Sequence, residues 1–221
     1  MKLTAVAVVS RPDVAYTVSA LSQLMQRYNE SHWTAAVRVL RYLKGAPDLG
    51  IMYDGYSMSD VIDLEAFADS DFAGDAQTRR SRTGAMIMLH GGPIWWSSHK
   101  QPQVTLSSAE AEFIAACSAV TSLKWYANML REMALEQEKP QLFIDNQAAI
   151  KLIKNPTHHT RTRHIDVKYK LVREAYQEGD FYLSYTPTTE QLADVLTKPL
   201  PPMAFRAIVN TLLYKWIERE C

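Results

Sequence analysis

An alternating apolar segment that ends in acidic residues constrains the fold of this chain more than any other stretch. Every second residue from 62 to 68 is apolar, a period of two that is typical of a partly buried β-strand. The segment then runs into Asp69. An ionised carboxylate beside a core is costly unless a cation or several hydrogen-bond donors compensate it. Asp69 therefore indicates either a divalent cation site or, because Asp and Gly favour turns, an ordinary solvated turn.

Composition and charge set the class of protein. With 221 residues, of which 47% are hydrophobic, the chain can bury one main core. Lys plus Arg and Asp plus Glu both number 24, so a nucleic-acid partner would need a local basic patch. The only two cysteines, Cys117 and Cys221, fit neither a disulfide framework nor a cysteine zinc site, which favours a reduced, intracellular setting. The apolar residues 1–9 are too short to span a membrane, and we expect no membrane association.

The order of periodic segments predicts an α/β domain preceded by two helices. Apolar residues recur at helical spacing in residues 14–28 and 33–43, which together form a helical hairpin too small to be stable alone. Three antiparallel strands follow at residues 62–69, 84–89 and 94–98. The remaining expected elements are a helix from 108, a strand at 141–144, helices at 148–154 and 165–179, a strand at 181–186, a short helix at 188–197 and a last helix at 203–219.

Three further acids occur in settings that resemble that of Asp69. Glu112 begins the buried stripe of the helix at 108, whereas Glu110, about 200° away around this helix, should be more exposed. The alternative for Glu112 is a helix N-terminal charge or a rim position. Asp145 follows the strand at 141–144, where it could instead cap the next helix. Asp194 lies in an apolar context within the short helix.

Four acids that converge at one edge of a sheet would repel one another unless cations bind among them. Hard divalent ions prefer oxygen ligands. Two such ions, about 3.5–4 Å apart, stabilise both the attacking and the leaving oxygen in phosphodiester cleavage.

Two other acids follow Asp69 closely in the sequence. We expect Asp71 to point to the other face of its strand and Asp75 to belong to the loop.

Basic residues gather at two places. Arg79, Arg80 and Arg82 form the only tight arginine cluster, which is either an ordinary charged turn or a phosphate contact. The second place, residues 158–164, contains three histidines, but no cysteine or carboxylate stands beside them at ligand spacing except Asp166, which belongs to the next helix. We therefore expect a contact loop there rather than a metal site.

Five segments together resemble the ribonuclease H domain at the C-terminal end of a copia-type LTR retrotransposon polyprotein. They occur in the order of that family over nearly the whole chain, at residues 68–75, 107–113, 145–150, 163–166 and 191–199. Residues 10–45 resemble the last segment of the reverse transcriptase that precedes the ribonuclease. The resemblance implies a helical reverse-transcriptase remnant at 1–48, a ribonuclease H-like domain at 49–200 and a C-terminal helix at 201–221.

The resemblance also implies a fold and a metal-binding site. The fold is a five-stranded mixed sheet flanked by helices. Asp69 would be shared by two Mg²⁺ ions, with Mn²⁺ as an alternative; Glu112 and Asp145 would hold one ion, and Asp194 would help to hold the other. Ser108 and Asn146 would contact the minor groove of an RNA/DNA hybrid, where the 2′-hydroxyl marks RNA.

The expected activity is therefore endonucleolytic cleavage of the RNA strand of RNA/DNA hybrids, giving 5′-phosphates. The alternatives are a catalytically silent binding or assembly module for a reverse transcriptase and an inert polyprotein fragment. The expected location is intracellular, either cytoplasmic, including virus-like particles, or nuclear. Two departures from the family stand out: residues 186–189, before the last carboxylate, contain no histidine, and no polymerase Tyr-x-Asp-Asp motif occurs. In addition, Arg82 stands where relatives usually have a small hydroxyl residue.

Overall fold

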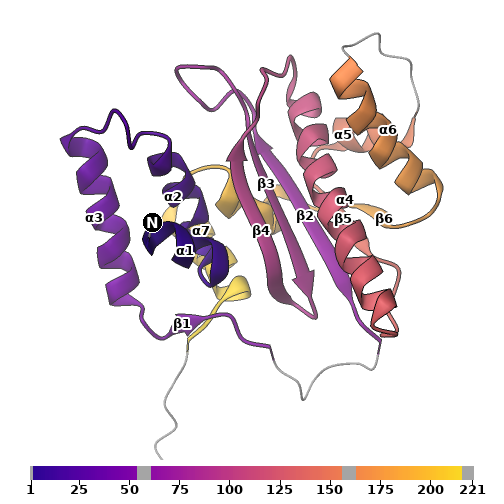
Figure 1. Ribbon diagram of the computed structural model, residues 1–221, viewed down its shortest axis with the longest axis horizontal. Helices are drawn as coiled ribbons and strands as arrows, with labels where there is room; N and C mark the ends of the chain where they lie inside the picture. Colours follow the sequence, from indigo (N-terminus) through magenta and orange to yellow (C-terminus); the bar gives the residue numbers. More distant parts are fainter. Residues whose placement is uncertain (1, 54–60, 156–162, 216–221) are drawn as a thin grey trace, which may run out of the picture.

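A five-stranded mixed sheet forms the centre of the computed structural model, which describes residues 2–53, 61–155 and 163–215 (Figure 1). The strand order is β4-β3-β2-β5-β6. The strands are β2 (Leu64–Asp71), β3 (Arg82–Leu89), β4 (Gly92–Lys100), β5 (Gln141–Ile144) and β6 (Tyr182–Tyr185). The first three are antiparallel neighbours, whereas β5 is parallel to β2 and β6 is parallel to β5. The expected five-stranded mixed sheet is thus confirmed.

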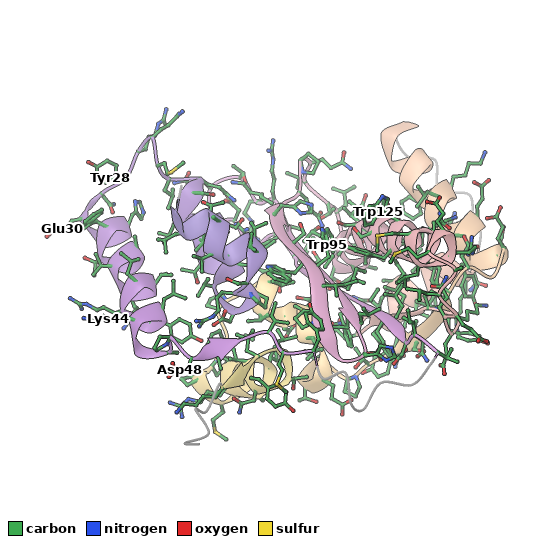
Figure 2. All side chains as sticks on the ribbon, turned by 60° about the horizontal axis from the view of Figure 1, so that its bottom comes forward. Tyr28, Glu30, Lys44, Asp48, Trp95 and Trp125 are labelled. Carbon is green, nitrogen blue, oxygen red and sulfur yellow. The ribbon has the colours of Figure 1, made fainter. Side chains whose placement is uncertain are left out.

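Helices flank this sheet, and they separate into two groups in Figure 1. The helices on the β5–β6 side are α4 (Ser108–Glu132), α5 (Gln147–Lys154) and α6 (Arg163–Gln177). On the β4 side lie α1 (Lys2–Val9) and α2 (Ala15–Ser22), and beyond them α3 (Glu30–Gly45). Figure 2 shows Glu30 and Lys44 at opposite ends of α3. Within the described ranges, no helix combines the length and the apolar character that a bilayer crossing requires.

The main core lies between the sheet and α4. Leu64, Ala66 and Ala68 of β2 pack with the small residues of α4, and Ala111 and Ala115 are completely buried. Small side chains allow the helix to approach the strands closely, as the expected apolar stripe requires. The opposite face of the sheet carries Phe67, which belongs to a second apolar cluster. The two faces of β2 are therefore both covered.

The N-terminal helices differ from the expectation. Residues 2–9, which we read only as an apolar segment, form α1, and Trp96 Nε1 donates a 2.6 Å hydrogen bond to the carbonyl of Ala7. A single helix at 14–28 was expected, but α2 ends at Ser22. Ser19 Oγ donates to the carbonyl of Ser98 at 2.7 Å, so α2 is attached to β4. The spacing of apolar residues within one segment carries no information about such contacts with a distant strand.

The C-terminal region also differs in its local geometry. The short helix expected at 188–197 consists of two 3-10 helices, η2 (Thr188–Glu190) and η3 (Leu192–Leu196), as is common for helical runs of this length. The last helix, α7 (Pro202–Leu212), ends before the expected residue 219 because Leu213 is extended and buried. Directly after Leu213, the short strand β7 (Tyr214–Lys215) pairs with β1 (Leu49–Gly50). The division of the chain at residues 48 and 200 stays a prediction.

Candidate metal centre

Three acidic side chains converge at one edge of the sheet. Oxygen atoms of Asp69, Asp145 and Asp194 all lie within 4.8 Å of one another. Asp69 lies in β2 and Asp145 directly follows β5; these strands are parallel and pair Ala68 with Ile144, so both acids reach the same edge. Asp194 comes from η3, which contacts β2 and β3 on the other side of the sheet from α4. Asp69 and Asp194 are buried, and Asp145 is half-buried.

Hydroxyl groups hold these carboxylates in place. Thr188 Oγ1 donates to Asp145 Oδ2 at 2.8 Å. Thr197 Oγ1 bonds to Asp69 Oδ2 and lies 3.1 Å from the backbone carbonyl of Asp194. Neither threonine was predicted from the sequence, although Thr197 follows Asp194 by three residues, a spacing that places neighbours on one face of a helical turn.

Lys198 is the cation nearest to the cluster among the described residues. Its Nζ lies 2.8 Å from Asp194 Oδ1 and 3.7 Å from Asp69 Oδ2. Although burial lowers the pKa of Lys198, the charges of Asp69, Asp194 and Asp145 more than offset this and raise it. Burial and Asp69 raise the pKa of Asp194 to about 7, against the opposing effect of Lys198. Lys198 was not predicted as a site residue, although its i,i+4 spacing from Asp194 is a sequence signal for a contact between them.

Glu112 is 5% exposed and is not one of the three acids that meet within 4.8 Å, but the charges of Asp69 and Asp145 act on it. Its Oε1 accepts a 3.2 Å hydrogen bond from the backbone N–H of Ser70, next to Asp69, while its Oε2 is buried without a partner in the described part of the chain. Burial, reinforced by the charges of Asp69 and Asp145, raises the pKa of Glu112 to about 10. A buried carboxylate oxygen without a partner, on which the charges of Asp69 and Asp145 act, fits a hard divalent cation, which prefers oxygen ligands.

Two expectations about neighbouring polar residues are wrong. Glu110 is not the more exposed acid, because the chain preceding α4 folds over it and the N–H of Leu106 donates to its Oε2 at 2.8 Å. Asp71 does not point away from Asp69: residues two apart on a strand share a face, and both the Asp69 and the Lys198 charges act on Asp71, whose pKa burial raises.

The helix cap that was the alternative role for Asp145 belongs to its neighbour. Asn146 Oδ1 accepts hydrogen bonds of 3.0 Å from the N–H groups of Ala148 and Ala149. Asn146 therefore caps α5, and the Asp145 carboxylate is left to face the other acids.

The predicted nucleic-acid residues lie in different settings. Arg79 is exposed and Arg80 is half-buried in the loop before β3. Arg82 instead faces α2: its Nη1 lies 2.9 Å from Ser19 Oγ, and its guanidinium lies 5.2 Å from the centre of the Tyr16 ring. Ser108 is exposed at the start of α4. The histidine-rich residues 158–162 lie outside the described residues.

Gln191 joins the strand of Asp69 to the 3-10 helix of Asp194. It is completely buried; its Nε2 donates to the carbonyl of Ala68 at 3.0 Å, and its Oε1 accepts from the N–H of Ala193 at 3.2 Å. Because Ala68 precedes Asp69 and Ala193 precedes Asp194, one side chain fixes the spacing of the two acids. We infer a positioning role for Gln191.

Replacing Gln191 with leucine should lower the free energy of unfolding by about 2–4 kcal/mol, because two buried backbone groups lose their partners. Mg²⁺ affinity should fall as well, since the spacing of the two acids is no longer fixed. Urea denaturation and calorimetry measure the two effects. The exposed Gln177→Leu serves as the control, and a Gln191→Leu protein with native stability and affinity would contradict the role.

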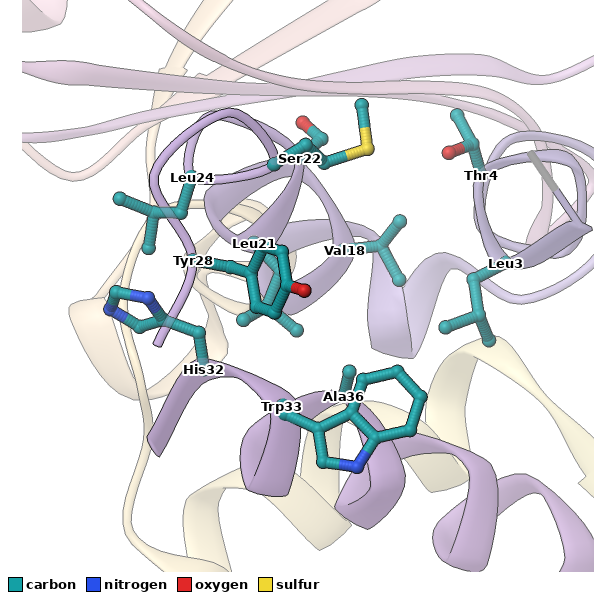
Figure 3. Close-up of a pocket in the computed structure, with 11 residues that line it drawn as sticks. Leu3, Thr4, Val18, Leu21, Ser22, Leu24, Tyr28, His32, Trp33 and Ala36 are labelled. Carbon is teal, nitrogen blue, oxygen red and sulfur yellow. The ribbon is translucent and has the colours of Figure 1, made fainter. Parts of the chain in front are cut away.

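An apolar cavity of about 570 Å³ lies apart from the acids, among the N-terminal helices (Figure 3). Val18 and Leu21 of α2 line it together with Tyr28, His32 and Trp33 around the start of α3. Among the residues that the structure describes, no carboxylate lines this cavity. It therefore shares neither residues nor chemistry with the candidate metal centre.

Comparison with known proteins gives sequence relatives that include Pol polyproteins of transposons. No family model matches the chain. It is 39% identical over 198 residues to the Retrovirus-related Pol polyprotein from transposon RE2 of Arabidopsis thaliana, covering 89% of this chain and 13% of that protein. It is 38% identical over 198 residues to the corresponding polyprotein from transposon TNT 1-94 of Nicotiana tabacum, covering 90% of this chain and 15% of that protein. The chain thus spans about one seventh of the length of these relatives.

Among solved structures, the chain is similar to LC11-RNase H1 in complex with an RNA/DNA hybrid, with a TM-score of 0.46, 14% identity, and coverage of 61% of this chain and 94% of that one. It is also similar to RNase H1 from Halobacterium salinarum, with a TM-score of 0.42, 16% identity, and coverage of 61% and 94%.

Proposed function

The chain belongs to the Pol polyproteins of copia-type retrotransposons, as a region with a ribonuclease H-like fold, and from this premise we propose that it cleaves the RNA strand of RNA/DNA hybrids. One observation supports this proposal above the others: three aspartate oxygens lie within 4.8 Å of one another at the sheet edge. The buried, unpartnered Oε2 of Glu112 beside them adds a further oxygen donor.

The residues of this chain would act by holding two ions in position next to the scissile phosphate. Asp69 would be shared by both ions, Glu112 and Asp145 would hold one, and Asp194 would help to hold the other. Divalent ions such as Mg²⁺ or Mn²⁺ would activate water and neutralise charge on the phosphate, leaving a 5′-phosphate and a 3′-hydroxyl. Thr188 orients the Asp145 carboxylate by its 2.8 Å hydrogen bond.

Recognition of the hybrid would come from residues around this edge. Ser108 is exposed, and Asn146 uses only its carbonyl oxygen as a cap, which leaves its NH₂ group to contact the minor groove, where the 2′-hydroxyl distinguishes RNA. Arg79 and Arg80 would contact phosphates, whereas Arg82 would do so only by leaving Ser19 and Tyr16.

The proposed organisation follows the resemblance. Residues 1–48 would be the end of the reverse transcriptase, residues 49–200 the ribonuclease domain and residues 201–221 a C-terminal segment. The rest of the polyprotein is then the natural protein partner, inside the cell and in virus-like particles or the nucleus.

A labelled RNA/DNA hybrid tests the activity. The native chain with Mg²⁺ should produce RNA fragments with 5′-phosphates, leave duplex DNA and duplex RNA intact, and lose cleavage with a chelator. Asp69→Asn should show no cleavage above background, while Asp48→Asn, an exposed acid-to-amide control, should match the native chain. Equal cleavage by the native chain and Asp69→Asn would overturn the proposal. Hybrid binding without Mg²⁺-dependent cleavage would favour a silent binding module.

A further inference from the structure

We propose that the Lys198 ammonium acts as a resident cation on the Asp69–Asp194 side of the cluster, so that the free protein binds a single divalent ion, on the Glu112–Asp145 side. The inference rests on the proposed function in taking these acids as a metal centre. It concerns how many ions the chain itself accommodates before nucleic acid arrives.

The position of Lys198 carries the first half of this inference. Lys198 Nζ lies 2.8 Å from Asp194 Oδ1 and 3.7 Å from Asp69 Oδ2. The side chain of Asp194 is only 7% exposed and that of Asp69 only 3%. The preceding residue, Thr197, is completely buried and bonds to Asp69, so the backbone that carries Lys198 is fixed at the cluster. The ammonium therefore already compensates both carboxylates where one of the two ions would bind.

On the opposite side of the cluster the Lys198 charge also acts on Glu112 and Asp145, but among the residues that the structure describes Lys198 forms ion pairs only with Asp69 and Asp194. Within the described ranges, neither Glu112 nor Asp145 forms an ion pair; Glu112 Oε2 is without any partner, and Asp145 Oδ2 receives only the neutral hydroxyl of Thr188. Two like charges interact more strongly as the surroundings become less polar. The binding free energy of a first divalent ion is consequently more favourable beside Glu112. A second ion must displace the Lys198 ammonium or share carboxylate oxygens with it.

Counting bound ions in the absence of nucleic acid tests this inference. We expect Mn²⁺ titrations of the full chain, followed by calorimetry and by loss of the free-ion EPR signal, to give one ion per native chain. Lys198→Met should bind two ions, or bind the second at least tenfold more tightly. The matched control is Lys170→Met, which removes another i,i+4 lysine–acid pair, with Glu174 on the surface of α6, and should stay at one ion.

A second pair of substitutions leaves Lys198 in place and decides the matter if Lys198→Met does not fold. Asp145→Asn should weaken the first ion at least tenfold, whereas Asp194→Asn should change its affinity less than threefold. Two ions on the native chain with unchanged binding by Lys198→Met, equal effects of the two aspartate changes, or no ion bound at all would each overturn the inference.

The outcome is separable from that of the proposed function. Two ions on the native chain together with Mg²⁺-dependent hybrid cleavage would overturn the resident-cation inference alone. One ion on the native chain, with the expected variant pattern but without hybrid cleavage, would overturn the proposed function alone.

Discussion

Replacing Glu112 with glutamine should abolish Mg²⁺-dependent cleavage of a hybrid while making the metal-free protein more stable at neutral pH. Glutamine keeps the size of the side chain and one oxygen but removes the charge that a divalent ion requires. Loss of a group that only supports a metal ligand costs about 10–100-fold, so loss of a ligand itself should cost about 100-fold or more. In the metal-free protein, however, the same carboxyl group is 95% buried and has an unpartnered oxygen, so its charge opposes folding.

The pH dependence of this stability has a definite sign. The pKa of Glu112 is raised from 4.5 to about 10 by burial and by Asp69 and Asp145, so between these pH values the folded chain keeps a proton that the unfolded chain has released. Native stability should therefore be fully present below pH 4.5 and fall steadily as the pH rises above it, until the folded pKa is reached. Glu112→Gln should lack this contribution.

Thermal melts from pH 4 to 9 in a chelator measure the difference. The two proteins should coincide near pH 4 and diverge as pH rises, with the variant melting at the higher temperature. Saturating Mg²⁺ should narrow or reverse the gap, because bound cations favour the ionised form of the native side chain. Glu132→Gln, an exposed change on the same helix, is the control. Parallel melting profiles, or cleavage within tenfold of native, would contradict the prediction.

Those parts of the site that depend on strand periodicity and strand ends could be predicted from the sequence. Two aspartates that each come at the end of an apolar strand meet when the two strands are parallel neighbours. β2 and β5 are such neighbours, and they bring Asp69 and Asp145 together. The hairpin between β3 and β4 was equally accessible, because its turn residues break two alternating runs.

Features that depend on what packs against a segment were not accessible. Helical angle alone placed Glu110 toward solvent, but the preceding loop covers it and Leu106 donates a hydrogen bond to it. Likewise, α1 is held by the indole of Trp96, 89 residues away in the chain, and no local pattern announces such a contact. Lys198 and Thr197 become part of the site only because η3 lies against β2.

A buried ion pair near the N-terminus gives a second large expected effect, on stability. Arg11 donates to Asp13 through Nε at 3.0 Å and through Nη2 at 2.7 Å, and Tyr42 Oη donates to Asp13 Oδ2 at 2.7 Å. Arg11 is 6% and Asp13 3% exposed. The carboxylate of Asp13 thereby joins the residues before α2 to α3.

Asp13→Ala should lower the free energy of unfolding by about 3–5 kcal/mol, because it leaves a buried guanidinium without its counter-charge. Urea denaturation measures this loss, and the exposed Asp48→Ala is the control. A loss below about 1 kcal/mol would contradict the prediction.

Hydrogen exchange of the same variant shows which parts of the chain lose stability. Faster exchange confined to α1, α2 and α3 would support the predicted boundary at residue 48. Faster exchange throughout the sheet would instead make these helices an integral part of the ribonuclease H-like domain.

The double substitution Arg11→Met with Asp13→Leu separates the charge effect from packing. Apolar side chains of similar size in place of a buried pair are often neutral or stabilising, whereas either single change leaves one charge uncompensated. The double variant should therefore recover most of the stability that Asp13→Ala loses, less the contribution of the Tyr42 hydroxyl, which loses its acceptor. If it is instead as unstable as Asp13→Ala, the ion pair serves mainly to fix the geometry of α3 through the Arg11 Nη1 contact with the carbonyl of Ala46 at 3.1 Å.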